Sequence, residues 1–412
     1  MMINILINAY AVAPNWGSEQ GMGWNWITNI AKYCNCHIIT EGEWKEEIEK
    51  AVAELPQKDN LHFYYNPVSD KIRQICWNQG DWRFYYYYRQ WQKKTLKIAE
   101  QICKENQIDV IHQLNMVGFR EPGLLWKIEG PKYVWGPIGG MENIPTAYLK
   151  DASAKLKLFC RLKNFINTFQ YTYQPNVKKA IKRSDCLIAA VKGVKDVLKE
   201  KHHRDSILIN ETGTNIDYGC PVRQSGTKKK HFDILWVGRF IYTKQLGLAL
   251  RVIEAVKDLD VRFHICGTGS DANVAFYKQR ASKLGIEDKC IWYGKVEHDK
   301  IQQIMANSDL FLFTSIMEAT STVILEAISS GLPVLCYDIC GFGPLVTEKI
   351  GRKIQISNPK QSIKEFALQI RDLYHNREKL DVMSSNELTY RDSLSWESKA
   401  EQMYAIYKLL VK

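Results

Sequence analysis

The chain has 412 residues and no long run of hydrophobic side chains. No window approaches the ~18 consecutive apolar residues that a membrane-spanning helix needs, and the first residues lack the basic segment and apolar stretch of a signal peptide. Only 12 prolines and 25 glycines are present, which is too few for a large disordered or fibrous region. At roughly 100–200 residues per domain, these absences predict a folded cytoplasmic protein of two or three domains.

Paired metal-binding cysteines are also missing. The eleven cysteines include no CxxC pair and no Cys and His spacing that is typical of zinc. Because eleven is an odd number, we expect reduced, mostly buried thiols rather than a disulfide framework. Asp258 and Asp260 have the DxD spacing of some metal-dependent transferases, but they lie between an expected helix and an expected strand, which is typical of a turn. We therefore expect neither a metal nor a resident cofactor.

Positive charge is unevenly distributed along the chain, whose formal net charge is +11. It is concentrated in residues 150–183, with a smaller cluster in residues 83–97. In the first cluster, apolar and basic residues alternate at helical spacing: Leu156, Phe159, Leu162, Phe165, Ile166 and Phe169 among Lys155, Lys157, Arg161 and Lys163. A basic and aromatic run at residues 82–91 is similar in kind.

Two interpretations of these basic segments remain open. A basic amphipathic helix can lie on an anionic membrane surface. The commoner alternative is a helix packed on its own domain, with its cations reaching past the apolar surface to water. Nucleic acid is not expected as a partner, because no known nucleic-acid-binding module is apparent.

Short β-branched runs alternate with longer helical patterns throughout the chain, which is typical of parallel sheets with crossover helices. A polar stretch at residues 215–230 separates two such halves and predicts a linker. The sequence therefore predicts an α/β protein with two doubly wound, Rossmann-like domains, residues 1–215 and 216–395. Ligands of such sheets bind beyond the carboxyl ends of the strands, so we expect a cleft between the domains to hold the site.

The first chemically informative segment follows an expected strand at residues 310–313. Glu318 lies in a loop, a helix is expected to begin near Thr320, and Glu326 lies about two turns further on. The N–H groups at a helix N-terminus attract phosphate, and carboxylates beside them can accept hydrogen bonds from sugar hydroxyls. The alternative is an ordinary helix start, with Ser321 or Thr322 as the cap and both carboxylates in water.

The second segment follows an expected strand at residues 232–237. The strand ends at Gly238, Arg239 follows at once, and Lys244 lies five residues later at the start of an expected helix. Two cations at a strand-to-helix turn can neutralise a departing diphosphate. Two solvated surface cations are the alternative, which is the commoner case for such a pair on its own.

Together, these segments resemble the retaining glycosyltransferases of family 4, which have the GT-B fold. The resemblance rests on Glu318-x7-Glu326, the GLPV that follows it, and Gly238-Arg239 with Lys244. It continues through residues 265–269 and 292–296, which look like the family's loops around the nucleotide base, and through residues 211–217. The resemblance implies that the second domain binds a nucleotide sugar, that the first binds the acceptor, and that an amphipathic helix in residues 396–412 packs back on the first domain.

The resemblance also implies a role for each residue of the donor site. Arg239 and Lys244 would bind the diphosphate, Glu326 the ribose hydroxyls, and Glu318 the hydroxyls of the donor sugar. Loop backbone would approach the phosphates and the base at the other donor-binding positions of the second half: Gly238, Gly267, Gly294, Val296, Thr320, Ser321 and Thr322. The family commonly has Gly-Phe-Gly after the first Glu, whereas this chain has Ala-Thr-Ser at residues 319–321, whose side chains could narrow the donor pocket.

The first half is matched at fewer points. Gly17 and Ser18 follow the first expected strand in a glycine-containing loop, whose backbone could approach the β-phosphate or the sugar; a tight turn before a helix is the alternative. His112 ends an expected strand where the family has a His at the cleft. Its implied role is a hydrogen bond to the donor sugar rather than general base catalysis, although a lone His at a strand end is otherwise usually structural.

The expected function is therefore that of a retaining, metal-independent glycosyltransferase of class EC 2.4. It would move a sugar from a nucleotide diphosphate, with UDP preferred, to a hydroxyl of a glycan or lipid-linked acceptor in cell-surface polysaccharide synthesis. No carboxylate is obviously positioned as a nucleophile, so the resemblance implies substitution on the same face of the sugar. The alternatives are a non-catalytic sugar-nucleotide-binding protein and another GT-B enzyme, such as a sugar-nucleotide epimerase.

Overall fold

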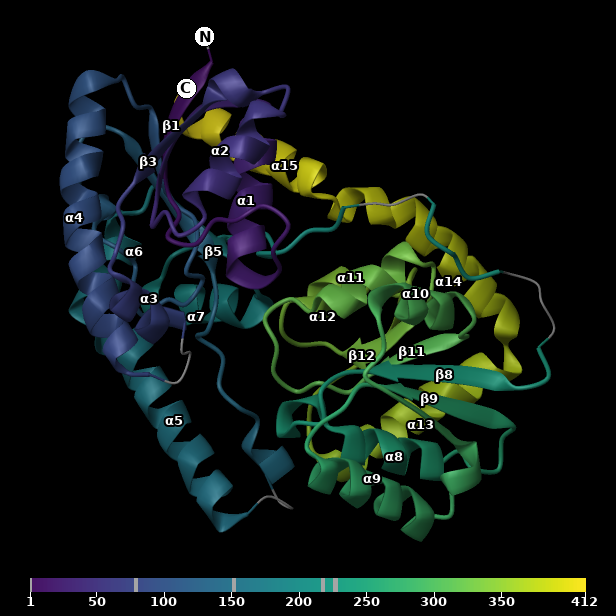
Figure 1. The fold of residues 1–412 in the computed structure, drawn as a ribbon. Helices are drawn as coiled ribbons and strands as arrows, with labels where there is room; N and C mark the ends of the chain where they lie inside the picture. Colours follow the sequence, from purple (N-terminus) through teal and green to yellow (C-terminus); the bar gives the residue numbers. More distant parts are fainter. Residues whose placement is uncertain (1, 78–80, 150–152, 216–218, 225–228) are drawn as a thin grey trace. The chain divides into compact units, whose positions relative to one another are not determined.

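The computed structural model describes residues 2–77, 81–149, 153–215, 219–224 and 229–412 (Figure 1). Within it the chain forms two compact units. Unit 1 comprises Met1–Glu142, Phe165–Gly213 and Trp396–Lys412, and unit 2 comprises Asn143–Asn164 and Thr214–Ser395. Parts of the expected linker, residues 216–218 and 225–228, lie outside the described residues, as do residues 150–152 of the basic segment.

Unit 1 is built on a seven-stranded sheet of order β3-β2-β1-β4-β5-β6-β7, in which neighbouring strands are parallel. Its strands are β1 Ile3–Asn8, β2 Cys34–Thr40, β3 Leu61–Tyr65, β4 Val110–Gln113, β5 Lys132–Ile138, β6 Cys186–Ala189 and β7 Ile207–Leu208. Ile5 and Ile7 of β1 belong to one apolar cluster, and Leu6 belongs to another. Because side chains alternate along a strand, the sheet is covered on both faces, as parallel sheets require.

The helices of unit 1 supply those two layers. They are α1 Ser18–Ile30, α2 Lys45–Ala53, α3 Asp70–Trp77, α4 Arg83–Glu105, α6 Pro175–Arg183, α7 Lys192–His202 and α15 Trp396–Leu410, and α5 Ala154–Tyr173 begins in unit 2 and ends in unit 1. α15 lies against α1 (Figure 1): the Trp396 ring meets the Trp26 ring edge to face at 5.8 Å, and Tyr404 stacks on Tyr33 at 5.3 Å. These aromatic contacts hold the last helix on unit 1.

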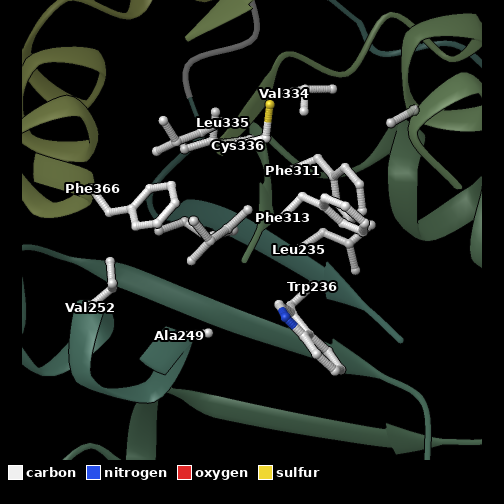
Figure 2. Close-up of a cluster of buried hydrophobic side chains, with 14 of the residues drawn as sticks. Leu235, Trp236, Ala249, Val252, Phe311, Phe313, Val334, Leu335, Cys336 and Phe366 are labelled. Atoms are coloured by element: carbon white, nitrogen blue, oxygen red, sulfur yellow. The ribbon is translucent and has the colours of Figure 1, made fainter. Parts of the chain in front are cut away.

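Unit 2 is built on a six-stranded parallel sheet of order β10-β9-β8-β11-β12-β13. Its strands are β8 Phe232–Val237, β9 Val261–Cys266, β10 Cys290–Gly294, β11 Leu310–Phe313, β12 Val334–Tyr337 and β13 Gly351–Ile354. Its helices are α8 Leu246–Glu254, α9 Asp271–Lys283, α10 His298–Ala306, α11 Thr322–Ser329, α12 Phe342–Leu345, α13 Pro359–His375 and α14 Arg377–Tyr390. Figure 2 shows part of the core, in which Val252 of α8 and Phe366 of α13 belong to the same buried cluster as the side chains of β11 and β12.

Short 3-10 helices complete the two units. They are Lys58–Asn60, Leu125–Lys127, Thr146–Leu149, Tyr242–Lys244, Glu287–Lys289 and Arg391–Leu394. Among the described residues, no helix is long and apolar enough to span a bilayer. The eleven cysteines all lie in described parts of the chain and form no disulfide there; six are buried, and burial raises the pKa of the Cys36 thiol well above its ordinary value.

The prediction of two parallel-sheet α/β domains is confirmed. The units differ from the predicted domains at Asn143–Asn164, which the sequence placed in the first domain and which belongs to unit 2, and unit 2 also resumes at Thr214 rather than at residue 216. Tyr148 anchors this segment: its ring meets Tyr337 edge to face at 5.9 Å, and its hydroxyl shares a hydrogen bond of 2.6 Å with Ser362 Oγ. Ser362 is 214 residues away in sequence, so no local pattern could reveal the contact.

Candidate functional site

Three predicted glycines stand at the carboxyl ends of neighbouring strands in unit 2. Gly238 follows β8, Gly267 follows β9 and Gly294 ends β10. The Gly238 N–H donates to the Cys266 carbonyl at 3.0 Å, and the Gly267 N–H donates to the Gly294 carbonyl at 2.8 Å. A Cβ on Gly267, whose φ is +141°, would lie 1.8 Å from the Gly238 carbonyl oxygen, so only glycine permits this approach. Motifs that are separate in sequence therefore form one edge of the sheet.

Lys244 and Glu318 are brought together beside this edge. Lys244 Nζ lies 2.6 Å from Glu318 Oε1, with the two side chains 13% and 19% exposed, and Nζ also lies 5.1 Å from the centre of the Phe313 ring. Two hydrogen bonds between the loops hold them in place: Thr314 Oγ1 donates to the Lys244 carbonyl at 2.9 Å, and the Ile316 N–H donates to the Thr243 carbonyl at 2.9 Å. The sequence assigned these two side chains to different parts of one donor, and the structure pairs them with each other.

Arg239, the second predicted cation, is exposed. It makes no ion pair with any residue that the structure describes, whereas Lys244 is already paired. Its neighbour Gly238 leaves room for the lysine, because a Cβ there would lie 3.3 Å from Lys244 Cδ. The loop therefore carries Arg239, which is in no ion pair with a described residue, and Lys244, which is paired with Glu318.

The helix α11 begins beside Glu318, two residues later than the sequence suggested. Ser321 is its N-cap residue and is buried, but its side chain makes no capping hydrogen bond. Ser321 thus occupies the cap position that the alternative interpretation predicted, but its side chain does not supply the capping hydrogen bond. Because the first N–H groups of a helix have no partner within it, the turn that starts at Thr322 keeps donors and positive dipole for an anion.

Glu326 lies inside α11 and is half-buried. Burial raises its pKa, and the nearby His298, the first residue of α10, partly lowers it. Val296, another predicted loop position, packs its side chain against the core of unit 2; contact of its backbone with a nucleotide base stays a prediction.

In unit 1, Gly17 and Ser18 form the exposed start of α1 after β1. Gly17 is the N-cap, and Ser18 has a φ of +56°, which is uncommon for a residue with a side chain. Gly21 is needed for this turn, because a Cβ there would lie 1.7 Å from the Trp16 carbonyl oxygen. Contact of Gly17 and Ser18 with a donor stays a prediction.

One carboxyl of this loop was not among the predicted residues. Glu19 Oε1 accepts a hydrogen bond from the Val117 N–H at 3.1 Å, whereas Oε2 is buried without a hydrogen-bond partner. Burial raises the pKa of Glu19 to about 7, against the lowering effect of the Val117 and Met116 N–H groups. In the sequence, Glu19 looks like an ordinary acidic residue in the first turn of a helix, so nothing marked it as buried.

The prediction for His112 is corrected by its surroundings. The residue is 0% exposed in β4, and both ring nitrogens are engaged: Nε2 with the Gly136 carbonyl at 2.7 Å and Nδ1 with the Tyr407 hydroxyl at 2.6 Å. Since a carbonyl only accepts, Nε2 carries the proton and Nδ1 accepts from Tyr407. Burial lowers the pKa of His112 to about 4, against the raising effect of the Gly136 bond. The ring has no group left for a sugar and instead ties α15 to the sheet.

Asp258 and Asp260, the DxD pair, lie between α8 and β9. Arg371 donates to Asp258 with Nη2 2.6 Å from Oδ1, and lowers the pKa of that carboxyl to about 2. Asp260 Oδ1 lies 2.6 Å from His231 Nδ1. No group of three or more His, Cys, Asp or Glu side chains among the described residues could hold a metal ion.

Residues 222–388 match the family model described as Glycosyl transferases group 1. The match covers the whole sheet of unit 2 and every predicted residue from Gly238 to Glu326. This part of the chain is therefore similar to the Glycosyl transferases group 1 domain.

Curated glycosyltransferases are also similar to this chain. The sulfoquinovosyl transferase SQD2 of Arabidopsis thaliana is 26% identical over 166 residues, which cover 40% of this chain and 31% of that protein. The lipopolysaccharide core biosynthesis mannosyltransferase LpsB of Rhizobium meliloti is 28% identical over 323 residues, 73% of this chain and 86% of that protein. Against SQD2 and two further relatives, the chain spans only 26% to 48% of the relative's length.

Solved structures match the whole chain. A glycosyltransferase from Rickettsia africae has a TM-score of 0.63 at 18% identity, covering 100% of this chain and 99% of that one. Anabaena HepE, solved in complex with UDP, has a TM-score of 0.59 at 14% identity, covering 99% and 100%. At this identity the likeness shows the fold, and it confirms the predicted GT-B architecture of two Rossmann-like domains.

Proposed function

We propose that the protein is a glycosyltransferase that moves a sugar from a nucleotide diphosphate to an acceptor hydroxyl. The observation that carries this proposal is the meeting of Lys244, Glu318 and the uncapped start of α11 at the edge that Gly238, Gly267 and Gly294 form. A diphosphate needs cations and N–H donors, and a sugar needs a carboxylate that accepts from its hydroxyls; this edge supplies both. The domain match and the fold support the same activity.

Each side chain has a role in this proposal. Arg239, Lys244 and the first turn of α11 neutralise the diphosphate as the bond to the sugar breaks. Glu326 accepts from the ribose, and Glu318 turns from Lys244 to the hydroxyls of the donor sugar. The anomeric carbon loses its bond to the phosphate oxygen and gains one to the acceptor oxygen on the same face, while that phosphate oxygen takes the acceptor proton. We propose that no metal takes part, since Arg239, Lys244 and the start of α11 supply the positive charge. A product with inverted anomeric configuration would refute the proposed retention of configuration.

We propose UDP as the donor nucleotide and a glycan or lipid-linked molecule as the acceptor. UDP is supported by HepE, a protein of similar fold that was solved with UDP. The acceptor class is supported by the relatives' names, which include a lipopolysaccharide core mannosyltransferase and a sulfoquinovosyl transferase. A place in cell-surface polysaccharide synthesis, at the cytoplasmic face of a membrane, follows as part of the proposal.

A thermal-shift screen of the full chain against UDP, GDP, ADP and their sugar conjugates tests the donor class. We expect one nucleotide to raise the unfolding midpoint without added metal, because a ligand that binds only the native state stabilises it by mass action. Lys244→Ala should lose that response, whereas Lys379→Ala should keep it, because Lys379 pairs with Asp372 at 2.7 Å elsewhere in unit 2. A response to no nucleotide at millimolar ligand would refute the proposal; a response without nucleotide release from any sugar conjugate would indicate a non-catalytic binder.

A further inference from the structure

The helix α5 presents an apolar stripe to solvent. Seven large apolar side chains of its 20 residues are exposed: Leu158, Phe159, Leu162, Phe165, Ile166, Phe169 and Tyr173. At 3.6 residues per turn they fall within about 120° of the helix circumference. Cys160, Asn167 and Tyr171, which are buried, lie roughly opposite. The commoner interpretation of this segment is a helix packed on its own domain, and it explains only the buried face of α5. The opposite face is an apolar stripe exposed to solvent, in which Phe165 is 70% exposed.

Unit 1 carries two further strongly exposed aromatic side chains at the start of α4. Trp82, directly before α4, is 77% exposed, and Tyr86 is 58% exposed. Arg120 of the same unit is bound to α5, because its guanidinium donates to Gln170 Oε1 at 2.7 Å and also to Asn167 Oδ1. Burial lowers the pKa of Arg120, and an electrostatic interaction with Tyr85, in the first turn of α4, raises it. We call the α5 stripe together with Trp82 and Tyr86 the aromatic-basic face.

The charge around this face has one sign. Residues 154–183 contain eight basic side chains and no Asp or Glu: Lys155, Lys157, Arg161, Lys163, Lys178, Lys179, Lys182 and Arg183. On the helix, Arg161 and Lys163 flank the stripe on its two sides. None of the four basic side chains of α5 makes an ion pair with a described residue. Unpaired cations on both borders of an apolar stripe are what a helix at a charged lipid interface requires.

We propose that the aromatic-basic face docks on an anionic lipid bilayer, with α5 lying along its surface. The apolar side chains would enter the boundary between headgroups and acyl chains, and the flanking cations would meet anionic headgroups. A second copy of this chain is a poorer occupant, because the same face on both partners would set like charges against each other. The proposal does not depend on the identity of the sugar donor.

Vesicle flotation of the full chain tests the docking. The probes are vesicles of phosphatidylcholine alone and of phosphatidylcholine with phosphatidylglycerol, each at low and high salt. We expect wild type to bind the anionic vesicles at least tenfold better than the neutral ones, and to lose that advantage at high salt. Phe165→Ser with Phe169→Ser should lower binding to anionic vesicles at least tenfold. The matched control, Phe276→Ser with Leu368→Ser, removes two side chains that are each 53% exposed on α9 and α13 and should leave binding unchanged.

Four results would overturn the proposal. They are no binding by wild type, equal binding to both kinds of vesicle, unchanged binding by the Phe165 and Phe169 variant, and a wild-type dimer in sedimentation that this variant converts to monomer. Both double variants should unfold at the wild-type temperature, because every replaced side chain is exposed. Nucleotide-induced thermal shifts should be the same in all three proteins, so failure of the donor proposal and failure of the docking proposal are separately visible.

Discussion

The two sheets use the polar side chains at their strand ends in opposite ways. In unit 2, Arg239 is exposed, and Lys244 and Glu318 form a partly exposed pair within reach of solvent. In unit 1, the corresponding groups turn inward: Asn8 at the end of β1 donates to Gln113 Oε1 at 2.7 Å, and His112 is enclosed by Gly136 and Tyr407. The same edge of a Rossmann-like sheet thus leaves charged side chains partly exposed in one unit and closes a hydrogen-bond network in the other.

This difference shows that residue type and position at a strand end do not by themselves identify a ligand contact. Lys244 remains available because its partner, Glu318, is itself a group that can exchange one partner for another. His112 is unavailable because both of its nitrogens are satisfied and it is 0% exposed. Variants of these residues should therefore affect different quantities: activity and ligand affinity in unit 2, and stability in unit 1.

The largest effect is expected from Lys244→Ala. Removing a cation that faces the departing diphosphate should lower the rate of sugar transfer about 100-fold or more, which corresponds to about 3 kcal/mol of transition-state stabilisation. The free energy of unfolding should change by less than about 1 kcal/mol, because the Lys244–Glu318 pair is partly exposed. Steady-state kinetics and urea unfolding of wild type, Lys244→Ala and Lys379→Ala provide the measurement. A Lys244 variant with wild-type turnover would contradict the assignment of unit 2 as the donor site.

His112→Gln should instead lower stability and leave turnover almost unchanged. The replacement leaves the Tyr407 hydroxyl or the Gly136 carbonyl without its partner in a buried place, so unfolding should become easier by about 1–3 kcal/mol. Turnover per folded molecule should stay within about threefold of wild type, because the ring contacts no ligand in this account. His375→Gln, at an exposed helix end, is the control. Full stability combined with lost turnover would restore the sequence-based prediction that His112 contacts the donor.

The pH dependence of stability tests whether His112 is buried as a neutral imidazole. The pKa of His112 is lowered to about 4 from an ordinary value near 6.5, so the unfolded chain takes up this proton first as the pH falls. Its contribution to stability is complete above about pH 6.5 and is lost as the pH falls toward 4, by up to about 1.4 kcal/mol per pH unit. The stability difference between wild type and His112→Gln should therefore shrink over this range. A difference that is constant from pH 7 to pH 4.5 would show that the ring is not buried as a neutral imidazole.

The smallest predicted effect concerns the pair itself. Glu318→Gln removes the carboxylate that holds Lys244 and that repels a diphosphate, so UDP without a sugar should bind about twofold to tenfold more tightly. Transfer from the sugar conjugate should nevertheless slow, because the sugar hydroxyls lose their charged acceptor. Isothermal titration with UDP and a transfer assay separate the two effects. Weaker UDP binding by Glu318→Gln would mean that the carboxylate supports the nucleotide site rather than competing for it.

The sequence supports the fold and the local loops of unit 2 well, because each depends on short patterns. Buried β-branched runs define the strands, and Gly267 is required where one backbone comes within contact distance of another. Lys244 pairs with Glu318 across 74 residues, His112 with Tyr407 across 295 and Tyr148 with Ser362 across 214, so no local pattern could predict these contacts. The periodicity of α5 likewise predicts a helix with an apolar stripe but does not say which side faces solvent.

The most direct test of the central claim compares a nucleoside diphosphate with its nucleoside. Isothermal titration of wild type and Lys244→Ala with UDP and with uridine isolates the contribution of the diphosphate, since both ligands share the base and the ribose. We predict that wild type binds UDP at least 100-fold more tightly than uridine, and that Lys244→Ala loses most of that ratio while its affinity for uridine is unchanged. An equal ratio in the two proteins would show that the diphosphate is not held by Lys244 in unit 2 and would contradict the account.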